Sequence, residues 1–422
     1  MISFILTALK IIFLLGFLIF IHETGHFLVA KLCKVRVNEF AIGFGPTIWK
    51  KQGKTTKYAL RLIPLGGFVS MEGEEERSSQ EGSFSEASIP KRIAIVAAGA
   101  IVNIIFALLV YFLLMTYTGN YSSLVIESTV PEYAAQQAGF LPDDEVIKIN
   151  GKSVIRKEDL DKVLQQSNGE SLTVTVKREG QWKDIAVTPT KQENKNTGIY
   201  LKGSSSGEVS TKIIALTPNS AAEKQGLEEN DEIQKINGIE VHSQSEIIKA
   251  ISEAPSETTI EFEVKRGNNM VTVDLTPDIT NSYYLGIYFK KAENTIFTNA
   301  YYALFETTDF AFSIVDNLKM LVTGNVSVNQ LMGPVGISEV VAKTSGIQDF
   351  VYILAVISLS LGVTNLLPIP ALDGGKILLL LIEAIRRKKL SEKTEINIQL
   401  LGFAILITLS IFVTYNDILR IF

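Results

Sequence analysis

The chain has 422 residues, of which 46% are hydrophobic and 20% are charged, and its mean hydropathy is +0.23. This composition is too apolar for an ordinary soluble protein and too polar for a chain that lies wholly in lipid, so both kinds of region are expected. The formal charge of −5 gives no indication of nucleic-acid binding. The single cysteine, Cys33, excludes an intrachain disulfide, and we interpret it as a small packing residue.

The first apolar segment contains the motif His22-Glu23-Thr24-Gly25-His26. Histidines at positions i and i+4 share one face of a helix, where both imidazoles can bind a single Zn²⁺. Glu23 is placed to take a proton from a zinc-bound water. The motif also occurs by chance in structural helices, but three polar groups within an apolar segment indicate a function. The segment is too long for a signal peptide and no cleavage site of small residues follows it, so we expect it to be retained.

Four segments are apolar enough to cross a membrane as helices: residues 5–29, a segment that begins near residue 93, and residues 351–372 and 396–415. Lysine and arginine concentrate between the first and second segments and between the third and fourth, so both loops are predicted to be cytoplasmic. The two termini and the large middle region then face outside, which is the periplasm in a Gram-negative cell. Residues 295–323 mix aromatic and charged side chains, which favours a helix at the membrane surface over a fifth span.

The middle region contains an internal repeat. The pattern Ala-Ala, Gly, Asp-Glu and Asn-Gly within residues 130–154 recurs 87 residues later, within residues 217–241. Two copies predict two α+β domains of one type. Together with Leu285-Gly286-Ile287-Tyr288, the pattern resembles PDZ domains of the bacterial type. Such domains can bind peptides by strand addition, and a rigid spacer without a ligand is the alternative.

Residues 365–375 predict the second half of the metal site. Their two prolines must break the third apolar helix, and broken backbone at membrane depth is tolerated only inside protein or beside a wet cavity. Asp373 follows the break and can therefore meet His22 and His26 at one depth, which leaves a fourth zinc position open, as in catalytic sites. As alternatives, Asp373 could cap the following helix, and Glu383 is a rival ligand that we interpret as interfacial.

Together, the histidine motif, the paired repeats, residues 333–338 and residues 365–375 resemble the site-2 protease family of intramembrane zinc metalloproteases, and within it the RseP type. The resemblance covers nearly the whole chain. It implies one Zn²⁺ on His22, His26 and Asp373, with Glu23 as the general base. One departure is Ala100, where close relatives often have proline; it concerns the packing of the second span, where Gly99 and Asn103 form a small-residue face suited to close helix contact.

The resemblance also implies an endopeptidase that cleaves membrane-spanning segments in the bacterial inner membrane. Its expected substrates are single-span proteins that have already been trimmed, such as anti-sigma factors, and signal-peptide remnants. The competing hypothesis is a membrane-anchored PDZ receptor whose metal site is structural or inert.

Residues 58–71 alternate like a β-strand and resemble the membrane-reentrant β region of this family; a simple cytoplasmic hairpin is the alternative. An exposed edge there could pair with an unwound substrate. The substrate-binding residues expected from this region and from the family are Gly66, Gly67, Phe68, Val69, Met71 and Asn365.

The predicted fold is a polytopic α-helical membrane protein with four transmembrane helices, a reentrant β region, and two α+β PDZ domains between helices 2 and 3. The predicted division is 1–30 for helix 1, 31–91 for the β region, 92–118 for helix 2, 119–203 and 204–291 for the PDZ domains, 292–348 for an interfacial helix and linker, 349–385 for the broken helix 3, and 386–422 for a loop and helix 4.

Overall fold

The computed structural model of the chain describes residues 2–74, 76–119, 121–201, 211–217, 219–256, 258–323, 332–342, 344 and 346–421. The chain forms two compact units, one made of Met1–Asn120 and Glu293–Phe422 and the other of Tyr121–Ala292. Three predicted features lie outside the described residues: the boundary at 203/204, part of the linker at 324–331, and Pro218 of the second repeat.

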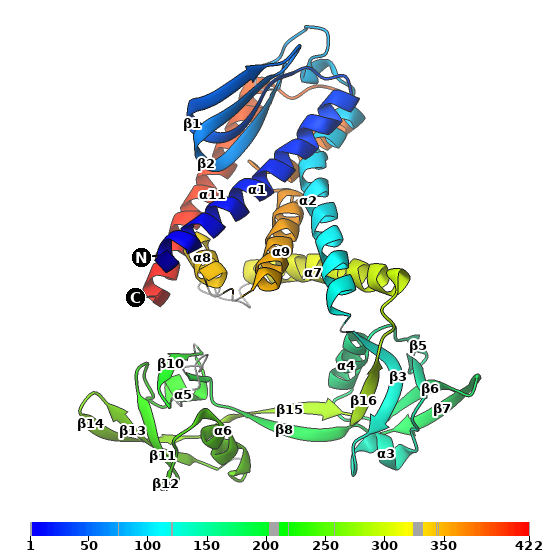
Figure 1. Cartoon of the computed structure of the whole chain (residues 1–422), viewed down its shortest axis with the longest axis vertical. Coiled ribbons are helices and arrows are strands. Elements are labelled where there is room, and N and C mark those ends of the chain that lie inside the picture. The colour runs from blue at the N-terminus through cyan, green and yellow to red at the C-terminus, as the bar shows by residue number, and fades with distance from the viewer. Residues whose placement is uncertain are drawn as a thin grey trace. The chain divides into compact units, whose positions relative to one another are not determined.

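Four long helices of the first unit carry the predicted apolar segments (Figure 1). They are α1 (Ile2–Leu32), α2 (Ile89–Thr118), α9 (Ile347–Asn365) and α11 (Glu392–Ile421). Among the described residues, these are the helices long and apolar enough to cross a membrane, within Leu6–Leu32, Ile89–Thr118, Ile347–Asn365 and Glu392–Ile418. The prediction of four apolar helices is therefore confirmed.

The third apolar segment is shorter than predicted and is broken as expected. Helix α9 ends at Asn365 rather than at residue 372, and α10 (Asp373–Arg386) begins after a non-helical stretch. Pro368 explains the early end, because proline lacks an amide donor and disfavours helical backbone in the residue before it. The break brings the start of a new helix to the position of Asp373.

Two further helices belong to this unit, α7 (Ile296–Val322) and α8 (Pro334–Ala342). Helix α7 covers the segment with mixed aromatic and charged residues, and it lacks the apolar window that the four long helices have. Its position at the membrane surface stays a prediction.

The predicted β region is a sheet between α1 and α2. Strands β1 (Val37–Gln52) and β2 (Lys57–Met71) pair, and a short 3₁₀ helix, η1 (Phe84–Glu86), follows. Residues 39–42 of β1 have partners on two parts of β2, residues 57–60 and 67–70. The end of β2 is thus held by β1 along one edge.

The second unit contains two modules that share one run of elements: a strand, a helix, two strands, a helix and two strands. In the first, strands pair in the order β16-β3-β4-β6-β7, with β5 on β4; in the second, the main sheet is β12-β11-β13-β14, beside a β10-β9 pair. The first module consists of β3 (Ser122–Thr129), α3 (Ala134–Ala138), β4 (Glu145–Ile149), β5 (Lys152–Ser153), α4 (Lys157–Gln166), β6 (Leu172–Arg178), β7 (Gln181–Val187) and β16 (Ile287–Lys291). The second consists of β9 (Ile199–Leu201), β10 (Ile213–Leu216), α5 (Ala221–Lys224), β11 (Glu232–Ile236), β12 (Ile239–Glu240), α6 (Gln244–Glu253), β13 (Ile260–Arg266) and β14 (Asn269–Leu275).

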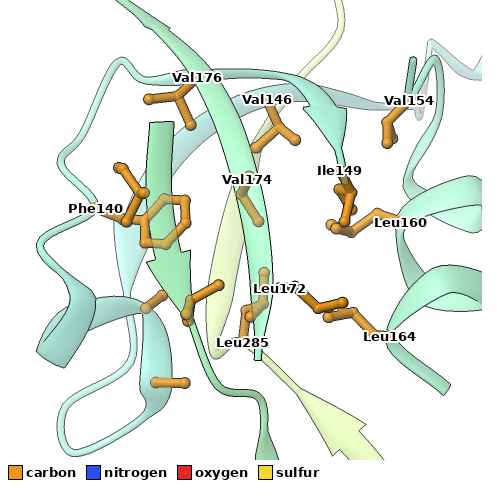
Figure 2. Close-up of a cluster of buried hydrophobic side chains, with 14 of the residues drawn as sticks. Phe140, Val146, Ile149, Val154, Leu160, Leu164, Leu172, Val174, Val176 and Leu285 are labelled. Atoms are coloured by element: carbon orange, nitrogen blue, oxygen red, sulfur yellow. The ribbon is translucent and has the colours of Figure 1, made fainter. Parts of the chain in front are cut away.

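The second module is inserted into the first. Leu285, just before β16, packs in the core of the first module beside Leu172 (Figure 2), whereas Ile199 and Leu201 pack against the core of the second. The chain leaves and returns through β8 (Thr190–Asn196) and β15 (Asp278–Tyr284), which pair along their full lengths. A linear division into 119–203 and 204–291 assigns β9 and β16 to the wrong modules, because two segments far apart in sequence complete one core.

The aspartate of the repeated Asp-Glu pair has a structural role in both modules. Asp144 and Asp231 are fully buried. Arg178 donates two hydrogen bonds of 2.7 Å to Asp144, and Arg266 donates two of 2.8 Å to Asp231. Burial by itself raises the pKa of Asp144, but the bonds from Arg178 outweigh burial and hold that pKa below its ordinary value.

Candidate metal centre and active site

Helix α1 places His22 and His26 one turn apart, and the start of α10 brings Asp373 to them. The two imidazole Nε2 atoms are 3.1 Å apart. Oδ2 of Asp373 lies 3.3 Å from Nε2 of His22 and 3.6 Å from Nε2 of His26. Three atoms from two distant segments therefore converge on one point. Asp373 is the first residue of α10, and Leu372 occupies the capping position without a side-chain bond, which argues against the capping alternative.

The three residues fit a zinc ion. Oδ2 of Asp373 is buried and has no hydrogen-bond partner among the residues that the structure describes, although an unsatisfied buried carboxylate oxygen is costly. All three candidate ligand atoms lie within 4.8 Å of one another. Two imidazoles and one carboxylate form a donor set that zinc accepts, with one coordination position left for water or substrate.

One face of α2 supports the histidine pair. Nδ1 of His26 is 2.8 Å from the backbone oxygen of Ile95 and can donate to it. A Cβ atom on Gly99 would lie 2.8 Å from Nε2 of His22 and closer still to Nε2 of His26, so only glycine fits there. Nδ2 of Asn103 lies 3.4 Å from Nδ1 of His22. The sequence indicated a small-residue packing face at positions 99 and 103; its spacing of four residues was the available signal for a shared contact.

A cavity of about 840 Å³ opens beside the metal ligands. Glu23 lines it together with Phe68, Val69 and Met71 at the end of β2. The backbone of Val69 lies close to the Glu23 carboxylate. The charged side chains of Glu74, Glu76, Arg77, Lys376, Glu392 and Glu395 line another part of the cavity, which makes it accessible to water.

The predicted substrate-binding residues are not all at this cavity. A Cβ atom on Gly67 would lie 3.2 Å from Cγ of Glu23, so Gly67 borders the site. Gly66 lies against the ring of Phe44 instead. Among the described residues, the cavity lining includes neither Gly66 nor Asn365, which is the last residue of α9.

Glu383, the rival ligand, lies outside the candidate metal centre, and its position at the membrane interface stays a prediction. Its side chain is buried and 3.0 Å from Nη2 of Arg92, which is also buried. The other carboxylate oxygen accepts a hydrogen bond of 2.9 Å from the backbone nitrogen of Leu390. The charge of Glu383 is therefore neutralised within the protein, far from a role as a metal ligand.

Comparison with known proteins decides the family. The profile of Peptidase family M50 matches residues 10–409. The chain belongs to this family. This M50 chain is 31% identical to the regulator of sigma-W protease RasP of Bacillus subtilis, over 99% of this chain and 100% of the relative. It is 32% identical to a putative zinc metalloprotease of Vibrio cholerae, over 96% and 97%. It is 30% identical to the regulator of sigma-E protease RseP of Escherichia coli, over 100% of both chains.

Membership in family M50 confirms the expectation of a membrane-embedded metalloendopeptidase over that of a scaffold. In a structural comparison, the PDZ domain of HtrA3 aligns with 22% of this chain and 93% of its own length, at 22% identity and a TM-score of 0.20. The assignment of the two modules as PDZ domains stays a prediction.

Proposed function

We propose that this M50 peptidase holds one zinc ion per chain on His22, His26 and Asp373 and hydrolyses peptide bonds within the bilayer. The observation that carries the proposal is the buried Asp373 oxygen, which faces two imidazole nitrogens and has no hydrogen-bond partner within the described ranges of the chain. The histidines lie in a helix apolar enough to span a membrane, where such a polar group is expensive without a function.

Glu23 is the proposed general base. Zinc would supply Lewis-acid activation of a water and of the scissile carbonyl. The Glu23 carboxylate, in the same cavity as the three ligands, accepts the proton of the attacking water and delivers it to the leaving amide nitrogen. The backbone of Val69 lies beside that carboxylate.

The end of β2 is the proposed docking site for an unwound substrate segment. Residues 67–70 pair with β1 on one edge, and Phe68, Val69 and Met71 line the cavity. A substrate strand laid beside this segment would bring its peptide bond toward Glu23 by β-augmentation. For Asn365, which lies outside the cavity lining, a substrate-holding role rests on the family resemblance alone.

Substrates and orientation follow from the charge pattern and the relatives. The two basic loops favour a cytoplasmic position, which places the termini and the two modules on the outer side of the bacterial cytoplasmic membrane. Two relatives are proteases whose names call them regulators of sigma-W and of sigma-E, which favours anti-sigma-factor-like, single-span substrates. The modules, as PDZ domains, would exclude substrates whose outer domain has not been removed.

Replacement of Glu23 by glutamine tests the proposal. Purified full-length protein in lipid nanodiscs is incubated with a single-span substrate, and the cleavage rate is measured. We expect Glu23→Gln to lower the rate by about 10²- to 10⁴-fold because a general base is lost, while zinc is retained. The control Glu170→Gln changes an exposed carboxylate of the first module and should cleave normally. Undiminished turnover by Glu23→Gln would refute the role.

A further inference from the structure

The two imidazoles of the site contact α2 through their second ring nitrogen, and they do so differently. Nδ1 of His26 faces the backbone oxygen of Ile95, a pure acceptor, at 2.8 Å. Nδ1 of His22 faces the side-chain amide of Asn103 at 3.4 Å. Asn103 is fully buried, and its Oδ1 has no hydrogen-bond partner among the described residues. A buried amide oxygen left without a donor, beside a metal-binding imidazole, requires an explanation.

The protonation of His22 explains the unpaired oxygen of Asn103. A neutral imidazole carries a single N–H, and a nitrogen that binds a metal must present its lone pair. Nε2 of His22 faces Asp373 and His26, so the proton belongs on Nδ1, which is then a donor. An amide NH₂ cannot accept that proton. A half-turn of the Asn103 amide exchanges its oxygen and nitrogen without changing its shape, and it places Oδ1 opposite Nδ1.

We propose that Asn103 is a positioning residue of the metal centre: its Oδ1 accepts the Nδ1–H of His22 and thereby fixes the tautomer and ring orientation that zinc requires. Ile95 does the same for His26 through its backbone. The inference rests on the proposed metal site and extends it to α2. Residues 95, 99 and 103 then form one supporting face, with an acceptor at each end and a glycine between them that admits the rings.

The competing explanation is that Asn103 only packs α2 against α9. Its backbone oxygen accepts a hydrogen bond of 2.9 Å from Ser358 of α9, so the residue does contribute to that interface. The two explanations differ in what must be retained at position 103. Packing requires the side-chain volume, whereas positioning requires a hydrogen-bond acceptor directed at His22.

Measurement of zinc affinity distinguishes the packing explanation from the positioning explanation. Full-length protein in detergent is titrated against a chromophoric zinc chelator as wild type, Asn103→Asp, Asn103→Leu and Ser358→Ala. We expect Asn103→Leu, which keeps the volume but has no acceptor, to bind zinc about 10- to 100-fold more weakly. Asn103→Asp, which keeps the acceptor, should bind at least as tightly as wild type, and Ser358→Ala should match wild type. Wild-type affinity in Asn103→Leu, or equal losses in both Asn103 variants, would overturn the proposal.

A spectroscopic measurement carries the test even if Asn103→Leu does not fold. The chain has only three histidines, and the third, His242, is exposed in the second module. In ¹⁵N-histidine spectra of the zinc-loaded wild type, His22 should carry its proton on Nδ1 and its metal on Nε2; a proton on Nε2 would overturn the assignment. His22→Phe identifies the site itself: if it binds zinc as tightly as wild type, the proposed metal centre fails together with this inference, whereas failure at Asn103 alone leaves that centre intact.

Discussion

Buried carboxylate oxygens have different hydrogen-bond partners in the two units of this protein. In the modules, Asp144 and Asp231 have both oxygens occupied by an arginine and a backbone amide. In the helical unit, the Oδ2 atom of Asp373 is also buried, but no hydrogen-bond donor reaches it from the described part of the chain, and two imidazole nitrogens face it. The satisfied carboxylates stabilise a fold, whereas the unsatisfied one is available to a ligand. In this protein, the presence or absence of hydrogen-bond donors, more than burial, distinguishes a structural carboxylate from a functional one.

The largest effects should come from removing one carboxylate of each kind. Asp373→Ala should weaken zinc binding by more than the roughly 100-fold expected for an outer-shell partner and stop cleavage, while the metal-free protein changes in stability by less than about 1 kcal/mol. Asp144→Ala should leave zinc binding unchanged but lower the free energy of unfolding by about 3 kcal/mol, because Arg178 loses its partner. Zinc titration and thermal denaturation measure the pair; a large stability loss in Asp373→Ala would break the comparison.

Substitution of two glycines, one beside the metal centre and one in the first module, should give effects of intermediate size. Gly99→Ala would push a methyl group into the imidazole pair, and we expect cleavage to fall by about 10²-fold, the usual cost of displacing catalytic groups by about 1 Å. Gly139 has φ +83° and open space around its Cβ position, so Gly139→Ala should cost only about 1–2 kcal/mol of stability and leave cleavage unchanged. Cleavage assays on both variants check this. Normal activity in Gly99→Ala would show that α2 does not fix the ligands.

The smallest expected effect is on the pH dependence of stability. The folded-state pKa of Asp144 is lowered, so its contribution to stability is complete above the unfolded value of about 3.9 and is lost as pH falls through the folded value. Arg178→Met removes the main lowering influence and leaves burial, which raises the pKa of Asp144, so the first module should lose less stability on acidification than in wild type. Amide exchange at a series of pH values measures that loss. The exposed pair of Lys157 and Asp161 offers a control, since Lys157→Met should change the loss very little. A loss in Arg178→Met equal to that of wild type would contradict the structural role of the pair.

Much of the metal centre could be predicted from local sequence. The spacing of His22 and His26 fixes their common helix face whatever the rest of the fold does. The prolines before Asp373 predict a broken helix, because their effect on the backbone is local as well. The structure brings these residues together, and their roles stay proposals. Asn103 was interpreted only as packing, since its relation to His22 depends on how α2 meets α1.

Two further features also depend on contacts between segments that are far apart in the sequence. Glu383 precedes a basic loop, which favoured an interfacial position, and its partner Arg92 lies almost three hundred residues earlier. The modules repeat in sequence at a regular offset, yet the core of the first is completed by Leu285, which follows the whole second module in the chain. Pairings of this kind depend on tertiary contacts between distant segments, which the pattern of one sequence does not contain.

X-ray absorption at the zinc edge tests the central claim most directly. In the purified full-length protein, the account predicts near one zinc per chain, with scattering from two imidazoles and oxygen donors, and loss of that first shell in Asp373→Ala. A zinc shell without histidine scattering, or one that is identical in wild type and Asp373→Ala, would contradict it.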